Sequence, residues 1–488
     1  MKHEHLLVAL FVLSLGGFSD CTNRVPQTDG SFNWPCWRGP DGNGISQETD
    51  WDPRALAGGP QVLWKVDVGF GYSNVAIRDN RLYSIGQEVH DAVILCLDAN
   101  TGKEMWRYVK NDSRWPQATP TVDNRSVYAL TTEGILLCLN SRNGRQRWQK
   151  DLVSEYGAVK PFYGFAGSPV VAGKFLILNV NTWGMALNKS TGKLQWTSDA
   201  LPPAKILGKC RANNRATYMT PVLYKYEGRL CALIYSWKGL YAVEPKTGKA
   251  LWLYEWKNYD RAKMPDPVTV ADRILIADDQ TDTDWEHCTT LLKIAGGKPT
   301  VLWKSTQLFS DVSSPVVLDG YIYGCHGGPS AGSPPPTLRC LDLESGHLKW
   351  IKSLYELGSH LKPTWISLTA GDSRLIALTD RGILYVAEAS SEGFKMISSC
   401  DVFAGKNRPR EFFTPPVLCN AKIYCRNFAG DLICINVGMH TSASHLMQDH
   451  CKDRSFQYLH LNFRQISAGR IFFVYRSLSH TDMARAPE

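Results

Sequence analysis

The segment Asp98-Ala99-Asn100-Thr101-Gly102-Lys103-Glu104-Met105-Trp106 contains the pattern that decides the fold of this 488-residue chain. An acidic residue or an amide is followed four positions later by glycine, and four positions further on by tryptophan. The same spacing recurs in Asn140-Gly144-Trp148, Asn188-Gly192-Trp196, Glu244-Gly248-Trp252 and Asp342-Gly346-Trp350. Recurrence at a nearly fixed interval indicates a chain built from similar supersecondary units.

Tryptophan marks seven of the eight repeats. Trp64 begins the series, Trp303 continues it, and the successive intervals from Trp64 to Trp350 are 42, 42, 48, 56, 51 and 47 residues. We therefore assign a structural role to seven tryptophans: Trp64, Trp106, Trp148, Trp196, Trp252, Trp303 and Trp350. A content of 40 Gly and 26 Pro is typical of a turn-rich β protein and disfavours helical bundles.

Each repeat contains four short runs with strand character. In the segment 118–151, the runs 119–122, 126–130, 135–139 and 146–150 are separated by Asp123-Asn124, Glu133-Gly134 and Asn143-Gly144. Such pairs supply the positive backbone angles that tight hairpin turns require. The tryptophan falls on the fourth run, where it can pack against the neighbouring unit.

The repeats number eight, and their first strands begin near Asn74, Thr119, Ser168, Thr220, Asp266, Ser314, Ile366 and Thr414. The last repeat ends at Val437 without a fourth strand, whereas 61–67 reads as a fourth strand with no first three before it. We predict an all-β, eight-bladed β-propeller that is closed by this N-terminal strand completing the last blade. Closure removes the exposed sheet edges that a linear solenoid leaves.

Blade seven departs from the pattern, because Glu392-Gly393 leads to Ile397 where the other repeats place tryptophan. We expect this blade to be the least well docked. The predicted organisation is a signal peptide with a possible lipobox at 1–21, a lead-in at 22–60, the propeller at 61–437 and a non-repeat tail at 438–488.

The N-terminus has the pattern of a secretory signal. Lys2 precedes an apolar run from Leu6 to Leu15, and small residues follow it. The run is shorter than the roughly 20 apolar residues that cross a bilayer. Cys21 stands where a bacterial lipoprotein carries its acylated cysteine, although Asp20 replaces the small residue usual there. We predict export to the periplasm or outer membrane, with Cys21 either lipidated, as the only membrane contact, or unmodified.

The chain contains 14 cysteines, and several occupy one position of the repeat. Cys96, Cys138 and Cys340 stand where other repeats have Ala186 and Ala242. A cysteine that is interchangeable with alanine fills a small buried space. Because the sequence has no CxxC and no adjacent cysteine pair, we predict no metal site and no disulfide framework.

The motif at 98–106 resembles the repeat of pyrroloquinoline quinone (PQQ) propellers, in the quinoprotein alcohol dehydrogenase-like superfamily. The resemblance covers 61–437, is specific in six of the eight blades, and extends to the Trp-Arg-Gly-Pro segment at 37–40. Size and signal are most similar to the eight-bladed lipoprotein of the outer-membrane β-barrel assembly machinery. The resemblance implies either a binding or assembly scaffold with an envelope protein partner, or a PQQ- and calcium-dependent alcohol or sugar dehydrogenase.

Dehydrogenases of that superfamily are longer, and many carry an adjacent-cysteine disulfide that this chain lacks. Their calcium ligands and catalytic aspartate cannot be transferred here residue by residue. We therefore expect a scaffold with no cofactor and assign no catalytic residue, with the dehydrogenase and a carbohydrate- or anion-binding module as alternatives. A net charge of +8, spread without runs, gives no reason to expect nucleic-acid binding.

The loops before the first strand of each blade lie near the axis of a propeller, on one face. Seven of these eight loops contain an aromatic residue and six contain Lys or Arg. Fixed cations around an apolar floor favour a flat anion, a sugar acid or an acidic peptide. The candidate ligand-binding residues are Tyr72, Arg114, Trp115, Tyr163, Arg215, Tyr218, Lys362, Trp365, Arg410 and Phe412. In the alternative interpretation, the aromatic rings plug the channel and the cationic heads are solvated.

Overall fold

A computed structural model describes most of the chain between residues 32 and 439. The described ranges are 32–112, 114–199, 217–236, 238–256, 265–278, 288–328, 335–357, 362–403 and 411–439. They all belong to the compact unit Met1–Met439, which is separate from His440–Glu488. The signal peptide, Cys21, Arg215, Arg410 and the C-terminal tail therefore lie outside the described residues.

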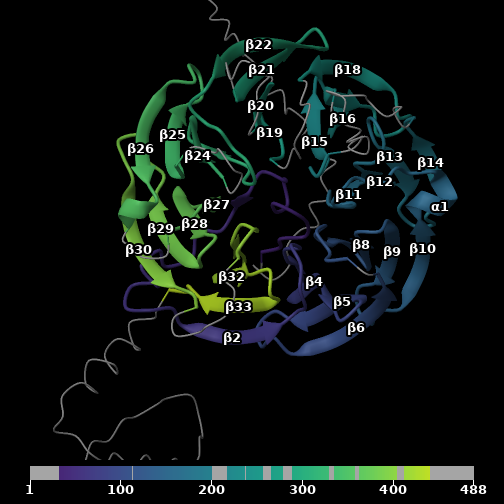
Figure 1. Cartoon of the computed structure of the whole chain (residues 1–488), viewed down its shortest axis with the longest axis horizontal. Helices are drawn as coiled ribbons and strands as arrows, with labels where there is room; N and C mark the ends of the chain where they lie inside the picture. The colour runs from purple at the N-terminus through teal and green to yellow at the C-terminus, as the bar shows by residue number, and fades with distance from the viewer. Residues whose placement is uncertain are drawn as a thin grey trace, which may run out of the picture. The chain divides into compact units, whose positions relative to one another are not determined.

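Eight sheets, antiparallel except for one short parallel strand in blade seven, surround a common axis, and each follows the previous one around the ring (Figure 1). The predicted class, an eight-bladed propeller that is nearly all β, is confirmed. In blades one to six, the strands run from the axis outward in chain order, so the first strand is innermost and the tryptophan-bearing strand is outermost.

The strands of blade two lie within two residues of their predicted boundaries, and the first four blades share one plan. Blade one comprises β3 (Ala76–Arg78), β4 (Arg81–Glu88), β5 (Asp91–Asp98) and β6 (Glu104–Asn111). Blade two comprises β7 (Thr121–Asp123), β8 (Ser126–Leu130), β9 (Ile135–Asn140) and β10 (Gln146–Asp151), followed by helix α1 (Leu152–Tyr156). Blade three comprises β11 (Val170–Ala172), β12 (Phe175–Leu178), β13 (Met185–Asn188) and β14 (Leu194–Thr197). Blade four comprises β15 (Val222–Tyr226), β16 (Arg229–Ser236), β17 (Gly239–Val243) and β18 (Ala250–Glu255).

The second half of the ring has the same plan. Blade five comprises β19 (Val268–Val270), β20 (Arg273–Ala277), β21 (Thr289–Ala295) and β22 (Lys298–Ser305). Blade six comprises β23 (Val316–Leu318), β24 (Tyr321–His326), β25 (Thr337–Asp342) and β26 (Leu348–Ser353), followed by the short 3-10 helix Tyr355–Leu357. Blade seven comprises β27 (Ile366–Gly371), β28 (Arg374–Thr379), β29 (Ile383–Glu388) and β30 (Lys395–Asp401). Blade eight comprises β31 (Val417–Leu418), β32 (Lys422–Arg426), β33 (Asp431–Asn436) and the N-terminal strand β2 (Val62–Asp67).

Strand β2 pairs antiparallel with β33, and Trp64 lies opposite Cys434. Blade one has the equivalent pair Trp106 and Cys96, and both pairings contain a register shift just before the tryptophan. The N-terminal strand therefore occupies in blade eight the position that β6 occupies in blade one. An ion pair at 2.7 Å between Lys65 Nζ and Asp431 Oδ1 joins the two strands.

The repeated acid–glycine–tryptophan spacing forms a joint between successive blades. The carboxylate of Asp98 accepts the N–H of Thr101 at 2.9 Å, which shapes a turn that ends at Gly102 with φ +69°. A Cβ atom on Gly102 would lie 2.7 Å from the indole ring of Trp64, in the preceding blade. The indole N–H of Trp64 donates to Ala99 O at 3.2 Å, in the same turn. Glycine is therefore required both for the left-handed backbone and for the approach of the ring.

Four further joints have the same construction, in which a glycine lies against the ring of the preceding blade's tryptophan and the indole N–H donates to a backbone carbonyl of that turn. The pairs are Trp106 with Gly144, Trp148 with Gly192, Trp196 with Gly248, and Trp303 with Gly346. The interpretation that the tryptophans pack against the neighbouring repeat is thereby confirmed for these blades.

The joint between blades four and five differs. A Cβ atom on Gly296, in the shifted turn of blade five, would have no neighbour within 4 Å. Trp256, which follows β18, is buried instead, and its indole N–H donates to Asp278 Oδ2 at 3.1 Å.

Blade seven is not poorly docked, contrary to the expectation from its missing tryptophan. Trp51 and Leu56 of the lead-in are buried in a core that also contains residues of β28, β29, β30, β32 and β33. Strand β1 (Ile45–Ser46) pairs in parallel with β27 and makes this the one five-stranded sheet of the described residues. The lead-in therefore supplies, from outside the repeats, apolar packing between blades seven and eight.

The lead-in also reaches the axis of the ring, where its purple trace crosses the centre of the view (Figure 1). The indole N–H of Trp37 donates to Asp266 Oδ2 at 2.6 Å, and Arg38 donates to Pro315 O at 2.6 Å. Asp266 is buried, which raises the pKa of its carboxyl, and the nearby Arg38 partly offsets this effect. The lead-in side chains Trp37 and Arg38 therefore lie in the channel, on the inner side of blades five and six.

In blades one to six, the residue two positions before each inner strand takes part in a hydrogen-bonded belt near the axis. At each step, a backbone N–H donates to the side-chain oxygen of the equivalent residue in the next blade, at 2.9–3.0 Å. The belt runs through Asn74, Thr119, Ser168, Thr220, Asp266 and Ser314, which are six of the eight predicted blade starts. This belt satisfies backbone groups that the short inner strands leave unpaired.

The cysteines behave as small core residues. All 11 cysteines of the described ranges are free, and ten of them are buried. Burial raises the pKa of the Cys96 thiol to about 11, and it raises the pKa of Cys138 equally. These thiols are therefore protonated and unreactive at neutral pH.

Candidate binding surface at the channel mouth

The candidate residues lie on a face built from two kinds of loop. One kind precedes the first strand of a blade, and we call these the axial loops; the other joins the second and third strands. Their backbones are bonded together: Gly71 N donates to Phe428 O at 2.9 Å, and Phe428 N donates to Glu411 O at 2.7 Å. In blade two, the Thr132 hydroxyl donates to Trp115 O at 2.7 Å. We call this surface the axial face.

Aromatic rings make contact across the mouth of the channel, from blade seven to blade two. The ring centroids of Trp365 and Phe413 are 4.5 Å apart, and those of Phe413 and Tyr72 are 4.8 Å apart. Tyr72 lies 4.7 Å from Phe428, and Phe428 lies 4.9 Å from Trp115. Most of these pairs are tilted or edge-to-face, the arrangements that aromatic rings prefer. Together they form an apolar floor that spans four blades.

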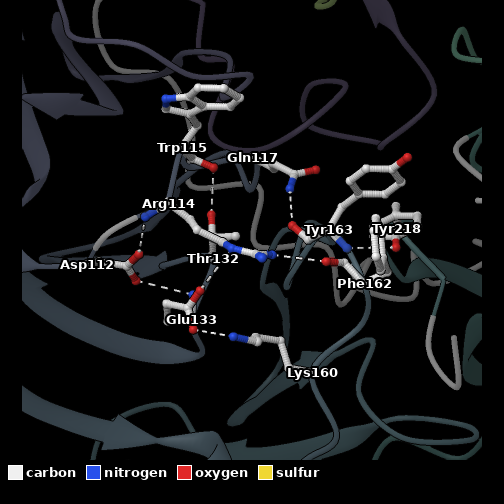
Figure 2. Close-up of polar contacts among 10 residues, drawn as sticks. All are labelled: Asp112, Arg114, Trp115, Gln117, Thr132, Glu133, Lys160, Phe162, Tyr163 and Tyr218. Atoms are coloured by element: carbon white, nitrogen blue, oxygen red, sulfur yellow. Dashed lines mark hydrogen bonds and ion pairs between the residues drawn. The ribbon is translucent and has the colours of Figure 1, made fainter. Parts of the chain in front are cut away.

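Arg114 is held in a network of polar contacts (Figure 2). Its Nε lies 3.5 Å from Glu133 Oε1, and its Nη1 donates to Phe162 O at 3.0 Å. Lys160 pairs with the second carboxylate oxygen of Glu133. The buried carboxylate of Asp112 accepts the backbone N–H groups of Arg114 and Glu133, each at 3.2 Å. Arg114 and Lys160 therefore share the carboxylate of Glu133.

Tyr163 and Tyr218 lie next to this network, on the axial loops of blades three and four (Figure 2). The Tyr218 hydroxyl accepts the backbone N–H of Tyr163 at 3.1 Å, and the two ring centroids are 5.6 Å apart. Tyr218 is buried, which raises its pKa to about 12, so it remains a neutral hydroxyl. Gln117 donates to Tyr163 O at 2.5 Å and fixes the exposed Tyr163 from the other side.

The remaining candidates are placed differently. Lys362 is exposed and Trp365 is buried, with its indole N–H donating to Phe412 O at 2.9 Å. Phe412 is fully buried against Phe403 at 5.3 Å and does not reach the mouth, which corrects its assignment as a ligand-contacting residue. The adjacent Phe413 reaches the mouth instead.

The candidates chosen from the sequence did not include Phe70, Phe162, Phe413 or Phe428 of the axial face, nor the buried Arg426 below the mouth. Phe428 contacts Tyr72 and Trp115, but it belongs to the turn between β32 and β33, whereas only the axial loops were compared. Arg426 is buried beside it and donates to Ile85 O at 2.9 Å and Gly69 O at 3.1 Å. Burial lowers the pKa of Arg426 to about 9, and Asp67 opposes that shift. Arg426 thus joins blade eight to blade one below the mouth.

The described residues contain no group of three or more His, Cys, Asp or Glu side chains placed to hold a metal ion. Within the same ranges, no helix has the length and hydropathy needed to cross a membrane.

Fold and surface together define a PQQ-repeat β-propeller with an aromatic channel mouth. The chain belongs to the family described as outer membrane protein assembly factor BamB, whose profile matches residues 90–352.

Relatives of two kinds are similar in sequence. The outer membrane protein assembly factor BamB of Yersinia pestis is 22% identical over 394 residues, which cover 77% of this chain and 78% of that protein. The quinohemoprotein alcohol dehydrogenase ADH IIB of Pseudomonas putida is 31% identical over 125 residues, 22% of this chain. The matched segment spans only 18% of that dehydrogenase.

Solved structures show the same fold. BamB from Moraxella catarrhalis has a TM-score of 0.54 at 14% identity, over 78% of this chain and 98% of that chain. The quinohemoprotein alcohol dehydrogenase from Comamonas testosteroni has a TM-score of 0.56 at 12% identity, over 84% and 81%. Because the same fold serves proteins of both names, the fold does not choose between a scaffold and an enzyme.

Proposed function

We propose that this protein is an assembly scaffold of the cell envelope, which binds a partner protein on its axial face and carries out no covalent chemistry. The observation that carries this proposal is the state of the described mouth: Arg114, Lys160, Gln117 and Thr132 are bonded to the protein itself (Figure 2), while several aromatic rings remain exposed. Such a surface suits association with a protein better than activation of a small substrate. The match to an assembly factor over most of both chains supports the same conclusion.

A quinone with calcium is the alternative that the superfamily implies. A quinone that carries carboxylates needs accessible cations, and calcium needs several oxygen ligands from acidic or amide side chains. At the mouth, the buried Arg426 is bonded to backbone carbonyl groups and is not accessible to a ligand carboxylate. Asp380 accepts both the N–H and the hydroxyl of Thr364, each at 3.0 Å. The described donor set therefore fits this cofactor poorly, and we propose that none is used.

We further propose an envelope location, on the pattern of residues 2–21 and the family. Cys21 remains a candidate for lipidation. Growth with a radioactive fatty acid tests it directly: label that is retained by the wild type and lost in Cys21→Ala identifies an anchor, whereas an unlabelled wild type excludes one.

The function is tested by capturing envelope proteins on immobilised full-length protein, and by adding PQQ and Ca²⁺ to the same preparation. We expect one envelope protein to be retained specifically, with no bound quinone absorbance and no alcohol-dependent dye reduction. Dye reduction that requires both PQQ and an alcohol would contradict the scaffold and support the dehydrogenase.

A further inference from the structure

Exposed aromatic side chains are concentrated on one part of the axial face. Five Phe, Trp or Tyr side chains are exposed in the described residues, and four of them lie in the axial loops of three consecutive blades. These four are Phe70, Trp115, Phe162 and Tyr163, exposed by 49, 51, 67 and 54%, and we call them the aromatic rim. Large apolar side chains gathered on a monomer surface mark interaction sites.

The rim is exposed but held in place. Trp115 packs edge-on against Phe428, and Phe162 packs edge-on against Tyr163 at 4.9 Å. The backbone carbonyls of Trp115, Phe162 and Tyr163 each accept a side-chain hydrogen bond, from Thr132, Arg114 and Gln117 (Figure 2). Rings that are ordered before binding lose less conformational entropy on association.

The charge next to the rim is positive where solvent reaches it. The side chains of Arg114 and Lys160 are 49 and 35% exposed, and they share Glu133, which is 32% exposed. The second carboxylate of the network, Asp112, is buried beneath them. An acidic side chain that approaches from solvent therefore meets two exposed cationic heads and one exposed carboxylate, a local excess of positive charge.

The polar groups favour a peptide over a sugar. A carbohydrate site needs side-chain donors and acceptors that are free to bond ring hydroxyls. Here the Gln117 amide, the Thr132 hydroxyl and one guanidinium nitrogen of Arg114 are already used to fix the rim backbone. What remains accessible is ring surface beside cationic heads, which matches apolar and acidic side chains.

From this arrangement we propose that the aromatic rim binds a linear segment of a partner protein that carries acidic side chains next to aromatic or other apolar ones. This inference rests on the proposed scaffold function and names the recognition element within it. Aromatic residues near Arg are the groups that dominate affinity in protein interfaces.

The test uses the full-length protein and a fluorescein-labelled synthetic peptide of alternating Glu and Phe residues. We expect binding that weakens with salt, and about a tenfold or greater loss of affinity in Trp115→Ala and in the double variant Phe162→Ala/Tyr163→Ala. Lys160→Gln should weaken binding less and reduce its dependence on salt. Tyr355→Ala is the matched control, because Tyr355 is equally exposed, at 50%, but lies outside the rim.

Three results would overturn this inference. One is unchanged affinity in the rim variants, with near-ultraviolet circular dichroism showing an intact fold. Another is equal binding of a peptide in which Lys replaces Glu. The third is binding of a linear maltooligosaccharide with the same dependence on the rim, which would assign the site to carbohydrate.

The proposal that the rim binds a peptide can be wrong while the proposed scaffold function is right. If rim variants lose the peptide but still retain the envelope partner as the wild type does, another surface carries the scaffold function. If the wild type retains no partner, the scaffold function itself fails, whatever the peptide does.

Discussion

Tryptophan serves this molecule in two regions with opposite surroundings. In the joints between blades, Trp106 is buried, its indole N–H is bonded to Ser141 O at 3.0 Å, and Gly144 leaves room for its ring. On the aromatic rim, Trp115 is half exposed, and only its backbone carbonyl and one side of its ring are engaged. In the joint, the tryptophan side chain stabilises the fold; on the rim, the fold positions an exposed tryptophan side chain.

The joint between blades seven and eight shows that the ring depends on packing and not on the repeat itself. There the repeat has Ile397, and Trp51 of the lead-in enters the shared core instead. The indole N–H of Trp51 has no hydrogen-bond partner among the described residues, unlike that of Trp106. Among the described residues, the contribution of the Trp51 side chain to this joint is apolar packing.

The largest expected effect separates the two regions directly. Trp106→Ala should lower the free energy of unfolding by about 3–5 kcal/mol, because it leaves a cavity between blades and removes an indole hydrogen bond. Trp115→Ala should change it by about 0.5 kcal/mol or less. Chemical denaturation measures both, and equal losses would erase the distinction.

The second largest effect is expected for Trp51→Ala, which should lower the free energy of unfolding by about 3 kcal/mol although Trp51 lies outside every repeat. The expected loss is somewhat smaller than for Trp106→Ala because no indole hydrogen bond is broken. Limited proteolysis should then cut first in blades seven and eight. A stability equal to that of the wild type would show that the lead-in does not support this joint.

A glycine pair sharpens the account of the joints. Gly144 and Gly296 both have positive φ, +69° and +57°, but a Cβ atom meets the Trp106 ring at 2.7 Å only in the first case. Gly144→Ala should therefore destabilise by about 1–3 kcal/mol more than Gly296→Ala, because both pay the backbone strain and only one adds the clash. Thermal unfolding measures the stability of both variants. Similar losses in the two would mean that backbone strain explains the whole effect and that contact with the Trp106 ring adds nothing.

The smallest effect concerns pH. Glu48 of the lead-in accepts the backbone N–H groups of Asn420 and Ala421 in blade eight, each at 2.7 Å. Burial raises the pKa of its carboxyl group. Because the pKa of Glu48 is higher in the folded state than in the unfolded state, the folded protein binds the proton more tightly. The stability that comes from this proton is present at low pH and is lost as the pH rises through the folded-state pKa. The slope is at most about 1.4 kcal/mol per pH unit for one group. Glu48→Gln should flatten the pH profile of unfolding over this window, and an unchanged profile would contradict the assignment.

Sequence reasoning reached the propeller because its determinants are periodic. The spacing from Asp98 to Trp106 recurs since each joint repeats one geometry, and the same alignment located the residues that form the polar belt. The lead-in carries no period, so nothing marked Trp51 as a core residue. The choice between Phe412 and Phe413 depends on which way two adjacent side chains point, and Phe428 lies in a turn outside the compared loops.

The most direct test of the central claim measures unfolding and peptide affinity on the same samples of wild type, Trp106→Ala and Trp115→Ala. We expect Trp106→Ala to lose stability and keep its affinity for the Glu–Phe peptide under conditions where it is folded. We expect Trp115→Ala to keep its stability and lose about tenfold or more in affinity. If Trp115→Ala instead lost stability, or bound the peptide as the wild type does, the rim would be part of the packing and not the binding surface.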